Sequence, residues 1–485
     1  MFMERGWKRY HTVWLMLFLG WVVSYIDRTL TGPVVTWMIE NKVEFLAESS
    51  NPHALGGLLG SLFFAGYMLT QFPGGYFGDK FGYRVIVVIS IVWAGVTTLL
   101  TGLVGGLVAF IALRVLTGLG EGVFYSNDRS LITQVTPPEK VGLGMGVVLT
   151  GLTLGLTIAT IATPYVVQMF QPLMGTHAWK APFLLMGAIT LIVGAMMYKW
   201  MRPDGFAVQS ESYGPPVGRL LQTSFLFLII IMTLYYATNA MQLSPATIGL
   251  VLTALAVLYI VYIYKAKSEE VGPILKSRNL LFLYLSFIPV LWHLWFYGFW
   301  SVAIVQDFGG GTLVSAALIA SFNAVAGLIG FPLGGRLADR FADGVNGKRN
   351  VLAVLTGLLT VFIFIFAFYV MSGGSNPVIM SLILFTSGVF FFALQPVNHA
   401  LTADFAPPKY KGAAFGMLNL FSEIGALLAP VISGAMRDHS GSWGSALLLD
   451  GILMSASLLL VIAVKPSLEG RLTTVINAQE TDVNH

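Results

Sequence analysis

Apolar residues run along this chain in stretches of roughly 20, separated by short polar segments. As a helix, a stretch of that length crosses a hydrocarbon core of about 30 Å. Barrel strands would alternate polar and apolar residues over about ten positions, and segments such as 221–234 and 361–370 do not alternate. Because lipid satisfies no backbone donor or acceptor, these runs must be helices. The pattern predicts an all-α integral membrane protein.

The apolar runs predict about 14 transmembrane helices. We expect the pair within 221–264, which could also be re-entrant, to lie outside the bundle and face lipid. The polar tail after Pro466 is expected to be disordered. The predicted spans are about 12–38, 55–77, 84–103, 107–133, 141–166, 181–201, 221–240, 245–264, 280–305, 312–335, 350–371, 377–402, 412–435 and 444–464.

Composition agrees with this pattern and excludes several classes of protein. The chain is 56% apolar and 10% charged, with a mean hydropathy of +0.77, whereas soluble proteins carry about 25% charged residues. Without cysteine there is neither a disulfide nor a thiolate metal site. The polar loops contain no nucleotide-binding loop, metal cluster or nucleophile–base set, so we expect no enzyme, no cofactor and no metal. The first run contains Asp27 and Arg28, which favours a retained span over a cleaved signal peptide.

The distribution of Lys and Arg predicts the orientation. If the N-terminus is cytoplasmic, all but five of the 27 basic residues lie on the cytoplasmic side. This bias explains the pI of 9.0 better than nucleic-acid binding does. It predicts a protein of the inner or plasma membrane with both termini in the cytoplasm. The five exceptions are Lys42, Lys180 and Arg437 outside, and Arg28 and Arg114 within spans.

The chain also repeats itself, which predicts two related halves of six spans each. One motif recurs 260 residues on and a second recurs 270 residues on, in the same order. The expected domains are residues 1–202 and 280–465 as six-helix bundles, 203–279 as an insertion with two extra spans, and 466–485 as a cytoplasmic tail. The repeated motifs are Gly75-Tyr-Phe-Gly-Asp79-Lys80-Phe with Gly335-Arg-Leu-Ala-Asp339-Arg340-Phe, and Pro137-Pro138-x3-Gly142-x3-Gly146 with Pro407-Pro408-x3-Gly412-x3-Gly416.

The first motif lies between the second and third spans and resembles the signature loop of the major facilitator superfamily. Glycines permit a tight turn and close helix approach, and an acid there faces basic residues and a helix start. The resemblance implies the major facilitator fold and a loop that latches the two halves on the cytoplasmic side. An ordinary charged loop is the alternative, which the second copy disfavours. The predicted gating residues are Gly75, Asp79, Lys80, Gly82, Arg84, Gly335, Asp339 and Arg340.

Charged residues within the first and fourth spans are the main candidates for function. A charge at mid-bilayer costs about 3 kcal/mol or more, and the first span contains Asp27 and Arg28. In the fourth span, a stripe at helical spacing brings Arg114, Glu121, Tyr125 and Asp128 to one face, toward the bundle interior. Acids among arginines can gain or lose a proton, and arginine offers a fork that matches a carboxylate. The alternative is that these ion pairs only fix helix packing.

Tyr25-Ile-Asp27-Arg28, together with Arg114-x6-Glu121-Gly122, resembles the anion:cation symporter branch of this superfamily. That branch includes sugar-acid importers and organic-anion carriers, and the resemblance implies proton coupling by Asp27 and Glu121 and substrate binding by Arg28 and Arg114. This chain lacks the prolines that often follow the fourth-helix glutamate, and it adds two helices. By the same resemblance, Tyr67 is predicted to line the pocket. The predicted substrate-binding residues also include Tyr25, and Tyr125 from the helical stripe.

The second half has polar stripes in place of arginines. They could bind a substrate's hydroxyl groups, or they could form interhelical hydrogen bonds between packed helices. Glu423 is the costliest of these residues to bury and is predicted to be a further proton site. The predicted substrate-binding residues of this half are His293, Tyr297, Gln395, Asn398, His399 and Asn419.

These patterns predict a secondary active transporter that couples proton entry to symport of a small organic anion, such as a sugar acid or another carboxylate, by alternating access. We expect a monomer in the lipid bilayer whose partners are the anion and protons. The alternative is a proton-driven antiporter that exports drugs or metabolites, with Trp292, Trp295 and Trp300 in its pocket. Two buried arginines argue against a cationic substrate.

Overall fold

The computed structural model describes residues 7–137, 140–201, 212–341, 345–407 and 410–465, and this described part is all helical with no strand. The predicted tail 466–485, part of the predicted inner loops and the second proline of each repeated Pro-Pro pair lie outside it. The first half consists of α1 (Arg9–Glu40), α2 (Glu44–Ala47), α3 (Pro52–Phe81), α4 (Tyr83–Thr101), α5 (Leu107–Gly122), α6 (Phe124–Val135), α7 (Val141–Met174), the short 3-10 helix η2 (Gly175–His177) and α8 (Lys180–Trp200).

Three helices follow before the second half begins. The inserted segment forms α9 (Gly214–Ala240), α10 (Pro245–Ala266) and the short α11 (Ser268–Lys276). The second half consists of α12 (Arg278–Gly309), α13 (Leu313–Val325), α14 (Gly327–Arg340), α15 (Val345–Met371), α16 (Pro377–Phe405), α17 (Lys411–Ser440) and α18 (Gly444–Ile462). Each half contains six spans, and one span of each is divided into two helices. The divided span is the fourth of the first half, α5–α6, and the second of the second half, α13–α14.

The predicted fold class is confirmed, because 14 helices or helix pairs are long and apolar enough to cross a membrane. Several boundaries differ from the prediction. α7 continues eight residues beyond the predicted end at 166, through Pro164 and Pro172, and α9 begins at Gly214 rather than 221. The predicted fourth span is interrupted at Val123, between α5 and α6. The inserted pair forms two full-length helices, which excludes a re-entrant hairpin.

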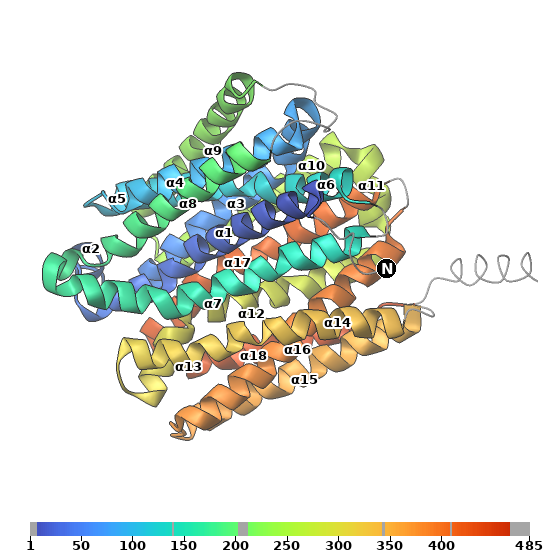
Figure 1. Cartoon of the computed structure of the whole chain (residues 1–485). Coiled ribbons are helices and arrows are strands. Elements are labelled where there is room, and N and C mark those ends of the chain that lie inside the picture. Colours follow the sequence, from blue (N-terminus) through green and yellow to red (C-terminus); the bar gives the residue numbers. More distant parts are fainter. Residues whose placement is uncertain (1–6, 138–139, 202–211, 342–344, 408–409, 466–485) are drawn as a thin grey trace, which may run out of the picture.

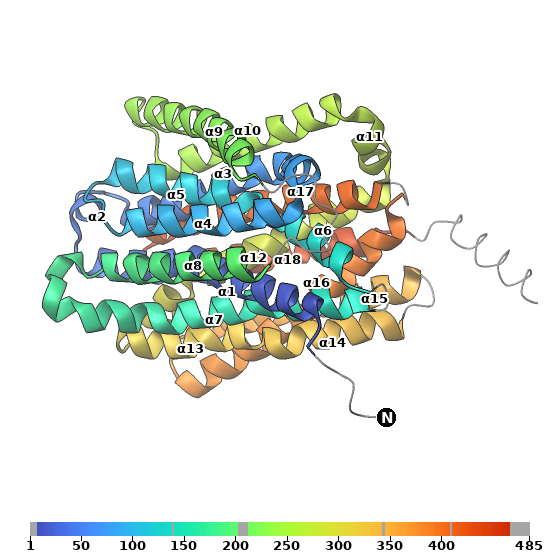
Figure 2. The same ribbon diagram turned by 45° about the horizontal axis from the view of Figure 1, so that its top comes forward.

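The long helices lie roughly side by side, and the chain enters and leaves the bundle at one end (Figures 1 and 2). At this end, called the termini end, Asn279 of α12 donates a 2.6 Å hydrogen bond to the carbonyl oxygen of Lys465, and Lys140 lies 3.1 Å from the hydroxyl of Tyr10. The distal end carries the turns that follow α1, α4, α7 and α9.

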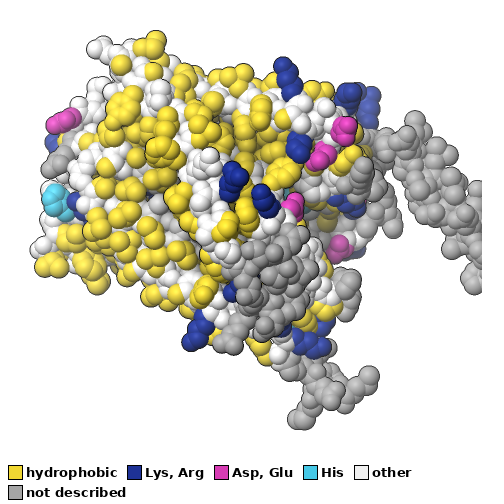
Figure 3. Space-filling model, turned by 90° about the horizontal axis from the view of Figure 1, so that it is seen from above, with side chains coloured by type: hydrophobic (Ala, Val, Ile, Leu, Met, Phe, Trp, Pro, Cys, Tyr) yellow, Lys and Arg dark blue, Asp and Glu magenta, His cyan; other side chains and the backbone are white. Residues whose placement is uncertain are grey.

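The outer surface suits a bilayer. In Figure 3 hydrophobic side chains cover most of the visible face, while charged side chains gather toward the termini end and a few mark the distal end. Large apolar side chains of several helices are open to the outside, among them Ile192, Phe225, Leu258 and Phe368, each exposed by more than half. In water such a surface would aggregate, whereas lipid tails solvate it.

The inserted helices lie at the periphery and touch both halves. α9 packs against α3 and α5, and α10 packs against α3 and α17. The hydroxyl of Tyr259 on α10 donates a 3.0 Å hydrogen bond to the carbonyl oxygen of Leu69 on α3. Lys267, in the turn after α10, lies 4.6 Å from the ring centre of Tyr76 on α3, and its hydrogen bond with that hydroxyl raises the pKa of its ammonium group.

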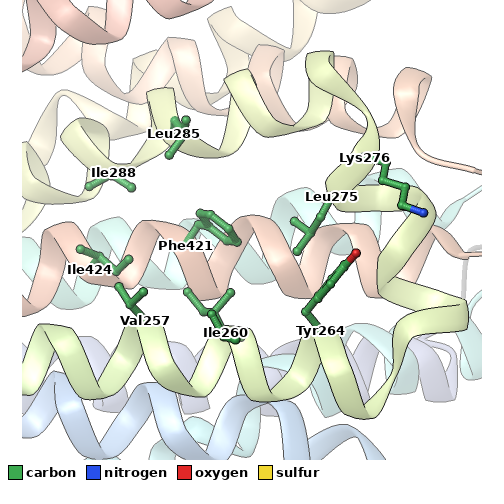
Figure 4. Close-up of a pocket in the computed structure, with 10 residues that line it drawn as sticks. Val257, Ile260, Tyr264, Leu275, Lys276, Leu285, Ile288, Phe421 and Ile424 are labelled. Carbon is green, nitrogen blue, oxygen red and sulfur yellow. The ribbon is translucent and has the colours of Figure 1, made fainter.

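A groove of about 480 Å³ separates the inserted helices from the second half (Figure 4). It runs between α10 and α12 over a floor made by α17, and its lining is apolar except for Lys276 and the hydroxyl of Tyr264. The lining residues are Val257, Ile260, Val261, Tyr264, Leu275, Lys276, Leu285, Ile288, Phe421 and Ile424.

The two halves meet most closely toward the distal end. A Cβ on Gly57 of α3 would lie 2.2 Å from the carbonyl oxygen of Pro430 on α17, so only glycine permits this approach. Asp438 of α17 accepts hydrogen bonds from the backbone N–H groups of His53 and Ala54 at 3.3 and 2.8 Å, and it also pairs with the His53 ring at 2.6 Å. Because these N–H groups begin α3, the carboxylate of one half caps a helix of the other.

Candidate transport site

Asp27 of α1 and Arg114 of α5 form an ion pair inside the first half. Arg114 Nη1 lies 3.2 and 3.3 Å from the two carboxylate oxygens, and its Nη2 lies 3.4 Å from the backbone oxygen of Asp27. Thr98 of α4 donates a further hydrogen bond of 2.7 Å to the same carboxylate. Both charged residues are 1% exposed. Three helices are thus joined around one compensated charge.

Arg28 and Glu121 form a second pair on the same two helices. Arg28 Nε donates to Glu121 Oε2 at 2.8 Å, and Ser24 donates to the same oxygen at 2.5 Å. The second carboxylate oxygen, Oε1, and Arg28 Nη2 are buried with no hydrogen-bond partner among the residues that the structure describes. This pair therefore retains one acceptor and one donor for a proton or a ligand.

Aromatic rings surround the guanidinium of Arg28. Its central carbon lies 4.1 Å from the ring centre of Tyr67 and 5.1 Å from that of Tyr25, and more distant contacts reach Phe63 and Trp21 at 5.6 and 5.8 Å. Such rings stabilise a cation while leaving its N–H edge open to an anion. Two of the three tyrosines predicted for the pocket, Tyr25 and Tyr67, thus lie at this arginine.

The break at Val123 carries the remaining polar stripe of the fourth span onto α6. Asp128 Oδ2 accepts a 2.6 Å hydrogen bond from the indole N–H of Trp21 and lies 3.3 Å from Arg129 Nη1. Tyr125 is half-buried, with its ring edge toward Trp21 at 6.1 Å. The predicted charge distribution counts Arg129 with the cytoplasmic side, although the predicted fourth span, 107–133, contains it. The sequence also left Asp128 without a partner.

Polar side chains of both halves meet between α3 and α17. Asn419 donates a 2.7 Å hydrogen bond to the amide oxygen of Gln71, and Gln71 Nε2 lies 3.4 Å from Glu423 Oε1. The other carboxylate oxygen of Glu423 has no partner within the described ranges. Nearby, the ring of Trp295 stacks on that of Tyr25 at 5.7 Å. Predicted residues of the second half, Glu423 and Asn419, thus face the first half.

His293 and Asp450 form a pair within the second half. His293 Nδ1 of α12 lies 2.7 Å from Asp450 Oδ2 of α18, with both residues 0% exposed. The rings of Tyr297 and Phe391, also of the second half, lie 4.7 and 4.9 Å from the imidazole. The predicted binding residues His293 and Tyr297 therefore lie beside an acid to which the sequence assigned no partner.

Three predicted residues lie along α16. Gln395 is buried, and its Nε2 has no partner in the described chain. Asn398 Oδ1 accepts a hydrogen bond of 3.5 Å from Thr402 on the same helix. His399 is half-buried between Phe287 and Phe415, at 5.6 and 6.0 Å, and it lies within electrostatic range of Arg129 in the other half.

The predicted gating residues lie at the termini end, and most are helical. In the first copy, Gly75, Asp79 and Lys80 belong to α3, which ends before Gly82 in a left-handed conformation with φ +93°. Tyr83 donates a 2.5 Å hydrogen bond to Asp79. In the second copy, Gly335, Asp339 and Arg340 belong to α14, which ends at Arg340.

Arg84 anchors the start of α4 to the end of α8. Its guanidinium donates to the backbone oxygens of Met201 and, at 3.1 Å, Tyr198. This predicted gating residue therefore binds within its own half. Across the part of the chain that the structure describes, no group of three or more His, Cys, Asp or Glu side chains is placed to hold a metal ion.

The chain is similar to bacterial transporters over nearly its whole length. It is 26% identical to the probable sulfoacetate transporter of Cupriavidus necator over 96% of each chain, and 23% identical to the quinolone resistance transporter of Acinetobacter baumannii over 96% and 95%. It is 24% identical to the probable galactarate/D-glucarate transporter of Bacillus subtilis over 92% and 89%.

The structure is similar to that of a solved transporter, and the sequence matches one family. A crystal structure of a D-xylose–proton symporter superposes with a TM-score of 0.69 at 16% identity, over 95% of this chain and 98% of the other. Residues 17–343 and 280–480 match the model of the Major Facilitator Superfamily. With two six-helix halves, a predicted anion:cation symporter signature and transporters as relatives, the chain belongs to the Major Facilitator Superfamily and is a transporter rather than an enzyme.

Proposed function

We propose that this protein is a proton-coupled symporter that imports a small organic anion by alternating access. The observation that carries the proposal is the pair Arg28–Glu121, which is buried between α1 and α5 and still has one donor and one acceptor free. When an arginine has a titratable acid as its charged partner, protonation of that acid leaves the guanidinium available to bind a substrate carboxylate. The relatives named for sulfoacetate and for galactarate or D-glucarate support an anionic substrate.

The exchange at Arg28 follows from electrostatics. Arginine stays charged at every accessible pH, so in a low-dielectric site it needs one anion beside it. While Glu121 is ionised, it fills that place. When Glu121 is protonated, the Arg28 fork is free to bind a substrate carboxylate, and loss of the proton expels it. Proton and anion thus travel together.

Asp27 and Glu423 have different parts in this scheme. The carboxylate of Asp27 accepts hydrogen bonds from Arg114 and Thr98, and Arg114 also donates to the Asp27 backbone oxygen. We therefore assign Asp27 to holding α1, α4 and α5 in register, with a proton when the pair opens. Within the described part of the chain, the hydrogen-bond partner of Glu423 is an amide, Gln71, which in turn accepts a hydrogen bond from Asn419. We assign it a proton that is gained or lost as α3 and α17 move against one another.

Alternating access requires ends that close in turn. The contacts of Gly57 with Pro430 and of Asp438 with the start of α3 close the distal end. We assign that end to the outside of the inner or plasma membrane and the termini end to the cytoplasm, in line with the bias of Lys and Arg. The predicted domain boundaries and the monomeric state belong to the same proposal.

Reconstituted transport tests the proposal. Purified protein in liposomes would be given labelled D-glucarate or sulfoacetate, with and without an inward proton gradient. Wild type is expected to accumulate one of them only with the gradient. Glu121→Gln is expected to lose accumulation but keep exchange, since a neutral side chain mimics the protonated state. Glu269→Gln, an exposed acid on α11, is the matched control. Gradient-driven accumulation by Glu121→Gln at the wild-type level would remove the coupling role.

Export of aromatic compounds is the second candidate. Trp295 stacks on Tyr25 and lies 4.6 Å from Phe64 of the first half, and one relative is named for quinolone resistance. Trp300, by contrast, donates its indole N–H to Pro430 at 2.8 Å and has a packing role. Proton-driven efflux of a fluoroquinolone from the same liposomes, with no anion accumulation, would decide for this alternative.

A further inference from the structure

Arg129 is a further arginine of the first half, and neither ion pair of the proposed cycle uses it. It lies on α6, two turns beyond Glu121, and its side chain is 24% exposed although the adjacent Asp128 is 0% exposed. A partly exposed guanidinium within a spanning segment needs access to water or to an anion.

Arg28 and Arg129 lie over the same ring. Their guanidinium carbons are 5.8 and 5.6 Å from the ring centre of Trp21. Tyr125 lies 5.0 Å from the Arg129 carbon, as Tyr67 and Tyr25 lie beside Arg28. The two cations therefore share one aromatic enclosure.

The enclosure around Arg28 extends to the second half. Tyr25, beside Arg28, stacks on Trp295 of α12 at 5.7 Å, and the side chain of Arg129 is 24% exposed. A ligand bound next to Trp21 could therefore reach both guanidiniums.

Both guanidiniums have hydrogen-bonding capacity left. Arginine carries five N–H donors. Arg129 contacts Asp128 through one 3.3 Å contact and also interacts with Tyr125, and Asp128 Oδ2 is shared with the shorter bond from Trp21. Arg28 Nη2 has no partner among the described residues.

We propose that Arg129 forms a second anion subsite, so that the protein selects dianions with an acidic group at each end over monoanions of the same length. This inference rests on the proposed function and narrows its substrate class. Arg28 binds one acidic group in place of Glu121, and Arg129 binds the other with donors that Asp128 leaves free. A monoanion would fill one subsite and leave the other guanidinium without its charge-assisted bond.

The competing interpretation is that Arg129 only compensates Asp128. It predicts that substitution lowers stability or lowers transport of every substrate equally. A subsite instead predicts a change of selectivity, which packing alone would not produce.

Matched substrates test this difference. D-glucarate would be compared with D-gluconate, and sulfoacetate with acetate, by uptake in liposomes and by thermal stabilisation of the purified protein. Wild type is expected to favour the dianion of its preferred pair by about tenfold or more, the value of one charge-assisted hydrogen bond. Arg129→Gln is expected to remove most of that preference by weakening the dianion about tenfold, with the monoanion changed less than about threefold.

A second variant and a control keep the result interpretable. Asp128→Asn/Arg129→Gln removes both charges, so no buried acid is left uncompensated, and it is expected to show the same loss of selectivity. Arg219→Gln, an exposed arginine on α9, is expected to match wild type. Equal loss for dianion and monoanion in the folded variants, or a wild type that treats both alike, would overturn the subsite while leaving anion transport in place. Failure of wild type to bind or move any of the four anions would refute the proposed function as well.

Discussion

The two halves of this transporter share a fold and a repeated motif, but they bury different chemistry. In the first half, three buried acids connect α1 with α5 and α6. Asp27 pairs with Arg114, Glu121 pairs with Arg28, and Asp128 accepts a hydrogen bond from Trp21. Among the residues that the structure describes, the second half has one fully buried pair, His293–Asp450, enclosed by rings of its own helices. Its other pairs, Lys348–Asp404 and Arg437–Asp307, are partly exposed. Its remaining polar groups are mostly amides.

The difference indicates which buried charged residues serve transport and which serve stability. Every charge within the bilayer must be compensated, so burial by itself does not identify a functional residue. The informative feature is a compensated charge that keeps a free atom and faces the other half. Arg28 and Glu423 meet this criterion, whereas His293 and Asp450 pair within one half. We therefore expect the first half to govern binding and coupling, and the pair of the second half to govern stability.

Arg28→Ala is expected to have the largest effect. It removes the proposed carboxylate site and leaves Glu121 buried without its cation. Initial uptake of the preferred anion should fall by about 100-fold or more, the equivalent of about 3 kcal/mol. Labelled uptake in liposomes measures this, with Arg219→Ala as the control. Uptake within a few-fold of wild type would remove Arg28 from the binding site and weaken the contrast between the halves.

Asp450→Ala should act on stability more than on transport. It leaves His293 without its acceptor deep in the second half, at a cost of about 3 kcal/mol. The midpoint of thermal inactivation should fall by several degrees, whereas uptake per folded molecule should stay within about threefold. His293→Leu/Asp450→Leu should recover part of the stability, because no unpaired polar group then remains. Normal stability with lost uptake would instead place the pair in the transport pathway, as the sequence suggested for His293.

Asn419→Ala probes the amide bridge between the halves. It removes a hydrogen bond to Gln71, which is worth about 1 kcal/mol, and leaves Gln71 less firmly held beside Glu423. Transport should slow by about fivefold, mainly through KM if the amide binds substrate and mainly through the maximal rate if it joins α3 to α17. Leu420→Ala, a packing change on the same helix, is the comparison. No change in either constant would leave Asn419 as a packing residue only.

The smallest effect concerns the repeated motif. Gly82→Ala places a side chain in a left-handed turn at φ +93°, at a cost of about 1 kcal/mol. Gly335→Ala adds a Cβ in open space on a helix, where alanine is slightly favoured. Thermal stability should therefore fall in the first variant and hold or rise in the second. Equal losses would indicate that both glycines serve close helix contact rather than backbone geometry.

Much of the architecture could be predicted because membrane insertion restricts the solutions. Runs of 20 apolar residues must be helices, and repeated motifs in one order imply repeated halves. Helical spacing also placed Arg114 and Glu121 on one face, and in the structure both face α1. The break at Val123 was not predicted, because no proline marks it and the apolar run continues through it.

The partners within the site could not be predicted. The sequence presents two acids and two arginines, but whether Asp27 binds Arg114 or Arg28 depends on the rotation and depth of α1 relative to α5. The same holds for Asp450 and His293, which are 157 positions apart. Arg129 was not among the predicted site residues, and only the structure shows its position over Trp21.

The sequence by itself determined that this protein lies in the membrane, that it has two related halves with an insertion, and which charged residues are too costly to be exposed to lipid. These follow from local transfer free energies and periodicity, which depend on neighbours along the chain. Only the tertiary structure decided which acid meets which arginine, which polar groups are left free, and that α10 bridges both halves. Those properties depend on side chains that are far apart in sequence and come within 3 Å only when the helices pack.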